Sequence, residues 1–101
     1  MPKYKITYAK SYKKSIKKLD NSDIMLVENI IDRLANDEIL EQKYNNHRLK
    51  GNLNGLFECH VKPNLLLIYS KDSEILELVA LRVGSHSDLF KKWKDRKCLK
   101  V

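Results

Sequence analysis

Three short apolar runs, separated by polar turns, dominate the second half of the chain. Residues 56–61 and 75–83 have the length and composition of strands, and residues 65–69 are continuously apolar. An uninterrupted apolar run of strand length, bounded by turn residues, is typical of a central strand that is covered on both faces. The intervening residues 62–64 and 70–73 are polar turn formers. We therefore predict a meander of three antiparallel strands.

The first third of the chain changes its period twice. Residues 3–8 alternate apolar and polar positions, which indicates an amphipathic strand. From Ala9 the spacing becomes helical, with Tyr12, Ile16 and Leu19 on one side. Asp20-Asn21-Ser22 then interrupts the pattern and offers an N-cap for a second helix. The apolar stripe of that second helix consists of Ile24, Val27, Ile30, Ile31 and Leu34.

The segment between the helices and the meander is polar. We expect residues 36–46 to be a loop anchored by Ile39, Leu40 and Tyr44, and residues 47–51 to form a short edge strand. The predicted order is β-α-α-β-β-β. It describes an α+β domain in which a two-helix hairpin packs on a small antiparallel sheet.

Size and charge bound the functional class. With 101 residues the chain is long enough for one compact core. The net charge of +7 is uneven, since residues 1–18 carry +7, residues 91–101 carry +5, and the middle carries −5. Such a distribution favours a polyanionic partner such as RNA, although a merely soluble surface is the alternative.

A stripe of lysines on the first predicted helix sharpens this expectation. Like charges at helical spacing repel by a few tenths of a kcal/mol per pair, and a polyanion would relieve that cost. A solvated helix face is the alternative explanation. The stripe comprises Lys10, Lys13, Lys14, Lys17 and Lys18, and we add Lys50 and Lys62 as candidate RNA contacts.

Several classes of protein are not expected. No apolar stretch approaches the length of a membrane span, and the N-terminus lacks the apolar core of a secretory signal, so we expect a cytoplasmic protein without a membrane partner. Cys59 and Cys98 are expected to be free thiols rather than a disulfide. We expect no cofactor and no metal. A zinc site made by Cys59, His60 and His86 is disfavoured because adjacent strand residues point to opposite faces.

The candidate chemistry lies at the ends of the meander strands. His60 ends the first strand, Arg82 ends the third, and His86 follows a break at Gly84. If these strand ends are adjacent, the three side chains gather with Asn64 of the first turn around one opening, and His47 lies nearby. Cleaving RNA without a metal requires a base, a cation and an acid. Histidine suits either proton transfer, arginine suits the phosphate, and an aromatic such as Phe90 could stack a base.

Three motifs in this order resemble a known family. They are His47-x-Leu49-x-Gly51, Glu58-x-His60-Val61-x-Pro63 and Arg82-x-Gly84-x-His86-x-x-Leu89-Phe90. Their spacing is similar to that of the YafQ-type toxins, a branch of the RelE/ParE superfamily of bacterial toxin–antitoxin systems. The resemblance implies a RelE-like domain over residues 1–90, followed by a basic tail over residues 91–101. The positions that match the family's functional residues are His47, His60, His86 and Phe90, with Arg82 as a phosphate contact.

The resemblance also implies an activity and partners. It implies a toxin that enters the ribosome and cleaves messenger RNA there, so inhibiting translation. A cognate antitoxin would wrap and block it, and the toxin–antitoxin complex would bind operator DNA through the antitoxin. The resemblance leaves open which histidine is base and which is acid, and we favour His86 as the acid.

This chain departs from the family pattern at three positions. Asn64 stands where an aspartate is usual, Leu65 where tryptophan is frequent, and Phe57 where an arginine is common. We therefore expect a slow or narrowed nuclease, with a catalytically silent RNA- or antitoxin-binding protein as the alternative. A gyrase-directed toxin of the ParE kind would share the fold, but the three histidines count against it.

Overall fold

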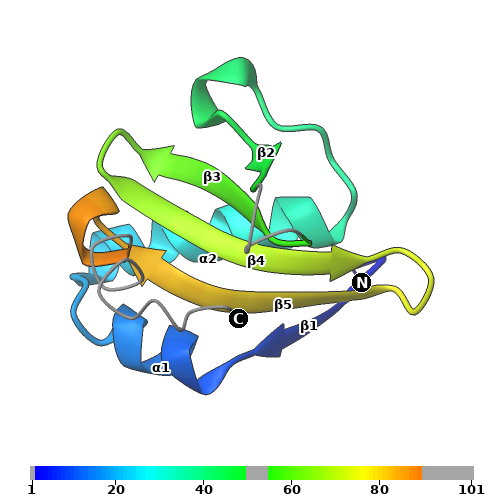
Figure 1. The fold of residues 1–101 in the computed structure, drawn as a ribbon, viewed down its shortest axis with the longest axis horizontal. Coiled ribbons are helices and arrows are strands. Elements are labelled where there is room, and N and C mark those ends of the chain that lie inside the picture. The colour runs from blue at the N-terminus through cyan, green and yellow to red at the C-terminus, as the bar shows by residue number, and fades with distance from the viewer. Residues whose placement is uncertain (1, 50–54, 90–101) are drawn as a thin grey trace.

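The computed structural model describes residues 2–49 and 55–89 of the chain. The expected order of one strand, two helices and further strands is confirmed (Figure 1). The elements are β1 (Lys5–Tyr8), α1 (Lys10–Ile16), α2 (Asn21–Ala35), a 3₁₀ turn (Gln42–Tyr44), β2 (His47–Arg48), β3 (Phe57–Lys62), β4 (Leu65–Asp72) and β5 (Glu77–Gly84). No helix in the described ranges is long and apolar enough to cross a membrane.

The strands form one five-stranded sheet in the order β1-β5-β4-β3-β2. The meander of β3, β4 and β5 is antiparallel, as predicted, and β4 lies at the centre of the sheet. The sheet as a whole is mixed, because β1 pairs with β5 in parallel. A period-2 pattern marks a strand but carries no information about the direction of its partner, so this pairing was not visible in the sequence.

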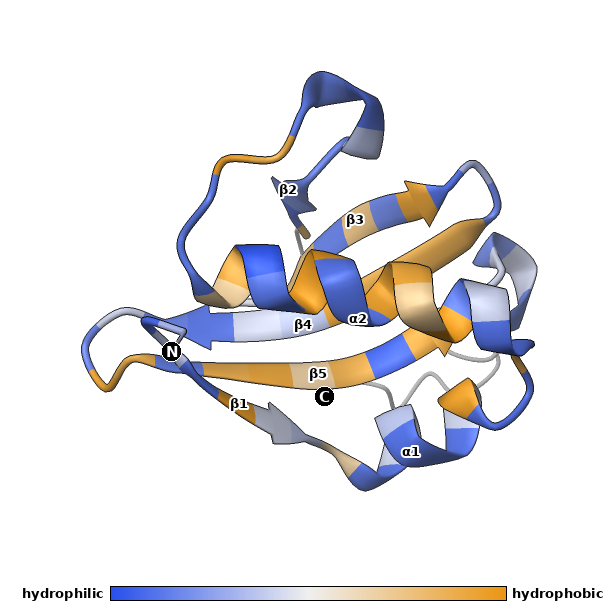
Figure 2. Ribbon diagram, turned by 180° about the vertical axis from the view of Figure 1, so that it is seen from behind, coloured by the Kyte–Doolittle hydropathy of each residue, from blue (hydrophilic) through white to orange (hydrophobic). Residues whose placement is uncertain are grey.

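The main core lies between α2 and one face of the sheet (Figure 2). The helix begins where predicted, because the Asp20 carboxylate accepts a hydrogen bond of 2.9 Å from the amide of Asp23. Val27, Ile31 and Leu34 are at most 1% exposed. Burying a side chain of this kind contributes about 1.5–3 kcal/mol each, so the predicted apolar stripe is what holds α2 on the sheet.

The shorter helix, α1, continues along β5 where β1 ends (Figure 1). The amide of Ala9 donates to the carbonyl of Ala80, and the Ser11 hydroxyl donates to the carbonyl of Leu81 at 2.6 Å. These two bonds satisfy the edge of β5 that β1 leaves uncovered. Tyr12 is buried in the main core, so the opposite, lysine-bearing side of α1 faces away from it.

Three details differ from the sequence prediction. The third strand of the meander, predicted over residues 75–83, is β5 at Glu77–Gly84. β4 continues to Asp72, so residues 70–72 belong to the strand and the turn occupies residues 73–76. In that turn Leu76 has a φ of 51°, a left-handed conformation that sequence patterns rarely indicate for leucine. Ile39 is not an anchor of the loop, because it is 94% exposed, whereas Leu40 is buried and Tyr44 packs against the core as predicted.

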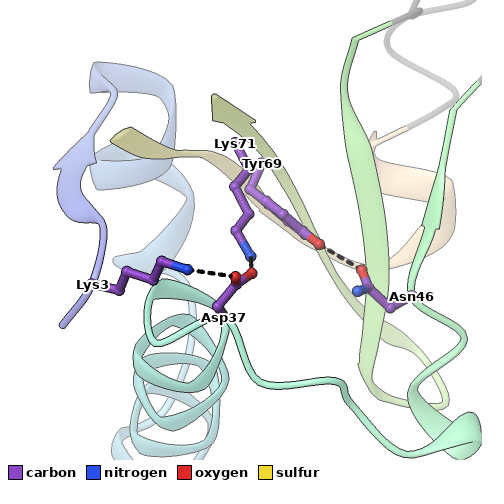
Figure 3. A network of polar contacts seen from close by, with 5 residues as sticks. All are labelled: Lys3, Asp37, Asn46, Tyr69 and Lys71. Atoms are coloured by element: carbon purple, nitrogen blue, oxygen red, sulfur yellow. Dashed lines mark hydrogen bonds and ion pairs between the residues drawn. The ribbon is translucent and has the colours of Figure 1, made fainter. Parts of the chain in front are cut away.

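The loop after α2 is fixed at its start by a pair of lysines (Figure 3). The carboxylate of Asp37 accepts hydrogen bonds from Lys71 at 2.7 Å and from Lys3 at 3.2 Å. These two bonds, the one from Lys71 first, lower the pKa of Asp37. The loop is thereby tied to both β4 and the N-terminal segment, and it delivers the chain to β2 at the edge of the sheet.

Candidate active site

The face of the sheet opposite α2 carries the predicted polar residues. Along β3, Cys59 and Val61 belong to the core under α2, whereas Glu58 and His60 point to the other side, as the alternation predicted. That other face has its own small apolar cluster, built on Leu66 and Ile68 of β4. The candidate site therefore lies over buried, packed side chains of the central strand.

Strand register aligns four positions in one row across this face. His47 of β2 is opposite Glu58, Glu58 is opposite Ile68, and Ile68 is opposite Arg82 of β5. Side chains of directly opposed residues lie on the same face of a sheet. The sequence separates His47 and Arg82 by 35 positions, and only the strand pairing brings them into one line.

A buried carboxylate joins two of the histidines. Glu58 is 5% exposed, and its Oε1 lies 3.3 Å from Nε2 of His47 and 3.8 Å from Nε2 of His60. The other ring nitrogen of His47, Nδ1, lies 2.7 Å from the carbonyl oxygen of Asn45. A carbonyl can only accept, so this contact is a hydrogen bond in the form of the ring that carries a hydrogen on Nδ1, and Nε2 is the nitrogen turned toward Glu58.

Glu58 is the site residue that the sequence prediction missed. The motif contains it, but it was not assigned a role. Its position in the sequence could have indicated such a role, because Glu58 shares a strand face with His60. A carboxylate that is buried on a sheet face is expected to be paired with a cationic or hydrogen-bonding group. Its partner His47 came from a different segment, which the sequence could not pair with it.

A β-bulge places Arg82. Between Ile68 and Tyr69 of β4 the register with β5 shifts by one residue, because Tyr69 is opposite Ala80 while Ile68 is opposite Arg82. The extra residue is Leu81, which packs with the apolar cluster on the site face. Bulges re-aim side chains and are frequent beside active sites. Here the bulge turns the Arg82 side chain toward the sheet face that carries Glu58 rather than toward the main core.

His86 is held next to the turn between β3 and β4. Its backbone amide donates to Oδ1 of Asn64 at 3.4 Å, which joins the two strand ends as predicted. Ser85 caps the helical turn that starts at His86, since its hydroxyl accepts from the amide of Asp88 at 3.2 Å. His60 and Gly84 are both opposite Leu66, so His60 lies on one side of β4 and the end of β5, two residues before His86, lies on the other.

Two hollows meet at Arg82. The first, which we call the lysine groove, has a volume of about 610 Å³ and is lined by Lys10, Lys14, Lys17, Lys18 and Arg82 together with serines of α1. The second, a cleft of about 430 Å³, is lined by Lys18, Lys62, Asn64, Arg82 and Ser85 among others. Four of the five stripe lysines therefore face a single groove, while Lys13 is exposed outside its lining.

Lys62 has a partner within the protein. Its ammonium lies 2.9 Å from the carboxylate of Asp23, and the hydrogen bond raises the pKa of Lys62. This exposed ion pair is worth little net stability, so Lys62 can exchange Asp23 for a phosphate. The predicted contacts Lys50 and Phe90 and the predicted tail over residues 91–101 lie outside the described residues.

The described residues contain no group of three histidine, cysteine or acidic side chains placed to hold a metal ion. Cys59 is fully buried on the α2 side of the sheet, away from His60 on the site side. Burial raises the pKa of its thiol to about 12. The thiol therefore has the character of an inert core residue rather than of a ligand or nucleophile.

Comparison with known proteins identifies the family. Residues 4–91 match the family model described as the bacterial toxin YafQ of type II toxin–antitoxin systems. The chain is 30% identical to the mRNA interferase toxin YafQ of Escherichia coli strain K12, over 84% of this chain and 94% of that protein.

Solved structures agree with this assignment. The chain resembles a metal-bound toxin from Helicobacter pylori, with 38% identity, a TM-score of 0.78, and coverage of 86% of this chain and 99% of that one. It also resembles YafQ in the E. coli DinJ–YafQ toxin–antitoxin complex, with 27% identity, a TM-score of 0.76, and coverage of 87% and 98%. With this match in sequence and fold, the chain belongs to the YafQ family of type II toxin–antitoxin toxins.

Proposed function

We propose that this protein is an endoribonuclease that cleaves messenger RNA on the ribosome and so inhibits translation. Membership of the YafQ family supports an mRNA interferase activity. The observation that carries the proposal is the shared sheet face, on which a buried glutamate contacts His47 and His60 while Arg82 lies across β4. The amide of His86 bonds to Asn64 in the turn at the end of these strands. The side chains available for each proton transfer and the cation available for the phosphate support a reaction without a metal.

The spacing of the strands suits a phosphate between an acid and a base. Strands β3 and β5 are two strand spacings apart, roughly 10 Å, so a scissile phosphate above β4 would have His60 on one side and, on the other, Arg82 of β5 with His86 in the helical turn that follows the strand. A base from the His47–Glu58–His60 group takes the proton of the 2′-hydroxyl, and the freed oxygen attacks phosphorus. Arg82 stabilises the charge on the phosphorane. His86 then protonates the departing 5′-oxygen, leaving a 2′,3′-cyclic phosphate and a 5′-hydroxyl.

The lysine groove gives the RNA backbone a path away from the scissile phosphate. It ends at Arg82, so a strand whose reacting phosphate contacts Arg82 can lay its neighbouring phosphates along α1. Phosphate contacts of this type supply affinity without sequence preference. The choice of codon would then depend on the ribosome and on residues that contact the base, a role that the sequence predicts for Phe90.

The three departures from the family pattern are expected to slow the reaction. Asn64 accepts a hydrogen bond from the amide of His86, as a carboxylate could, but it cannot take a proton. Leu65 is buried, so it offers no exposed ring for stacking. Phe57 stacks on Tyr69 with ring centroids 5.3 Å apart and supplies no charge. A silent RNA- or antitoxin-binding protein is the second candidate, and Asn64 is the observation that favours it.

A cognate antitoxin is the proposed protein partner. The related E. coli toxin was crystallised as a DinJ–YafQ toxin–antitoxin complex. By charge complementarity the antitoxin should present acidic residues to the lysine groove. The toxin–antitoxin complex would bind operator DNA through the antitoxin, and the ribosomal substrate places the toxin in the cytoplasm.

Cleavage of a translated messenger in a purified translation system tests the proposal, with wild type compared against His86→Ala. We expect cuts within the ribosomal A site that His86→Ala loses, while Ser87→Ala, a change at the neighbouring exposed position, retains them. Unchanged cuts in His86→Ala would remove His86 from the mechanism. A folded wild-type protein that binds RNA but produces no cuts would establish the silent binding protein instead.

A further inference from the structure

The strand that carries His47 is too short and too exposed to hold it in place by burial. β2 consists of His47 and Arg48 only, and both residues are exposed. A side chain that must meet a buried carboxylate at 3.3 Å needs its backbone fixed. The contacts that hold this backbone in place are made by the two residues on either side of His47 in the sequence. Their side chains contact residues on the opposite, α2-facing side of the sheet.

The preceding residue, Asn46, is tied to the central strand (Figure 3). The hydroxyl of Tyr69 donates to Oδ1 of Asn46 at 2.6 Å. Tyr69 is 2% exposed and belongs to the main core, and burial raises the pKa of its phenol, so the hydroxyl remains a donor. A hydrogen bond anchored in the core therefore reaches the residue next to His47.

The following residue, Arg48, is tied to the same place. Its guanidinium carbon lies 5.2 Å from the ring centroid of Phe57, which is opposite Arg48 in the register. Phe57 in turn stacks on Tyr69, with ring centroids 5.3 Å apart and an interplanar angle of 15°. Tyr69 and Phe57 thus form one aromatic pair that holds both neighbours of His47.

The turn before β2 positions the backbone carbonyl that orients the imidazole of His47. Asn45 has a φ of 43° and ends the 3₁₀ turn, where its amide donates to the carbonyl of Gln42 at 3.0 Å. In this left-handed conformation the carbonyl oxygen of Asn45 lies 2.7 Å from Nδ1 of His47, so it can accept a hydrogen bond from the Nδ1–H form of the ring. Any rotation of Asn46 would move that carbonyl, because the two residues share a peptide bond.

We propose that Tyr69 and Phe57 are positioning residues that set the orientation and the tautomer of His47, Tyr69 through Asn46 and Phe57 through Arg48. The consequence for cleavage rests on the proposed function, but the consequence for the imidazole does not. The proposal also gives Phe57 a role. Where the family commonly has an arginine, this chain has a ring that completes the support beneath β2.

Removal of one oxygen atom tests the proposal. In Tyr69→Phe the ring remains and the bond to Asn46 is lost. The matched control is Tyr12→Phe, because the buried hydroxyl of Tyr12 has no hydrogen-bond partner within the described part of the chain. Nitrogen NMR shifts of the His47 ring, recorded at a pH where the imidazole is neutral, report the fraction of the Nδ1–H form. Steady-state cleavage on the ribosome, with messenger in excess over the protein, reports kcat and KM.

We expect Tyr69→Phe to lower the Nδ1–H fraction of His47 and to reduce kcat by about tenfold with KM unchanged, as for the loss of an interaction needed only in the transition state. Tyr12→Phe should change neither. Asn46→Ala, at an exposed position, should reproduce the Tyr69→Phe result without risk to the core. Asn46→Asp still accepts the bond from Tyr69, so it should keep the wild-type Nδ1–H fraction and the wild-type kcat. Phe57→Leu should have a smaller effect in the same direction.

The two readouts separate failure of this proposal from failure of the proposed function. If the wild type does not cleave RNA, the tautomer of His47 still decides whether Tyr69 positions it. A wild-type tautomer in both Tyr69→Phe and Asn46→Ala would overturn the positioning role, whatever happens to kcat.

Discussion

Glu58→Gln is the substitution that most directly examines the site. It removes a charge and keeps the size and shape of a side chain that is 5% exposed. The carboxylate faces Nε2 of both His47 and His60, at 3.3 and 3.8 Å. A histidine that acts as a base becomes an imidazolium in the transition state. The negative charge of Glu58 would stabilise that species more than it stabilises the neutral ring.

The magnitude follows from the two contacts. A hydrogen bond to a charged group is worth about 1.5–3 kcal/mol. The value applies to the shorter contact, with His47, once that ring is protonated in the transition state, and the longer one to His60 adds little because the interaction weakens steeply with distance. As about 1.4 kcal/mol corresponds to a factor of ten in rate, we expect cleavage to slow by roughly tenfold to a hundredfold. The free energy of unfolding should change much less, since glutamine retains the packing and can still hydrogen-bond.

The assay is single-turnover cleavage of a messenger held on purified ribosomes, with thermal unfolding recorded on the same samples. Glu77→Gln is the matched control, because that glutamate also lies on a strand and is partly buried, but it accepts from Thr7 at 2.8 Å near the other end of the sheet. A Glu58→Gln protein with the wild-type rate would refute the reasoning. A loss of rate shared equally by Glu77→Gln would assign the effect to general charge or stability.

Three further predictions concern the same molecule. Asn64→Asp should preserve the bond to the amide of His86 and raise the cleavage rate, as measured in the same assay; a lower rate would show that a second charge harms the site. Lys14→Ala should flatten the dependence of RNA affinity on salt by a slope of about 0.7 for the lost phosphate contact, as read by fluorescence anisotropy, whereas Lys13→Ala, outside the lysine groove, should change it less. In a Cys98→Ser background, Cys59 should resist iodoacetamide until the protein is unfolded. Its pKa of about 12 against an ordinary 9.0 leaves far less thiolate, and mass spectrometry would detect early alkylation if the thiol were accessible.

Much of the secondary structure was predictable because it depends on local patterns. The continuously apolar run that starts at Leu65 is the central strand, and its five apolar residues are at most 5% exposed. The alternation along β3 correctly separated the Glu58 side from the Cys59 side. The N-cap of α2 and the short edge strand at His47 also occur where the pattern indicated.

The candidate site was predictable in its residues but not in its connections. Residue type and motif spacing indicated the three histidines, Arg82 and Asn64. The bond from His86 to Asn64 confirms that two separate strand ends meet. The central role of Glu58 was not predicted, because its importance comes from strand register with β2 rather than from any neighbour in the sequence.

The sequence by itself determined the strands, the helices, the apolar faces and the chemical inventory of this protein, because each depends on residues within a few positions of one another. Tertiary structure alone decided the parallel pairing of β1, the bulge at Leu81 that aims Arg82, and the meeting of His47 with Glu58. These features depend on which strands become neighbours and in what register. That choice is made by the burial of the whole sheet against α2 rather than by any local pattern.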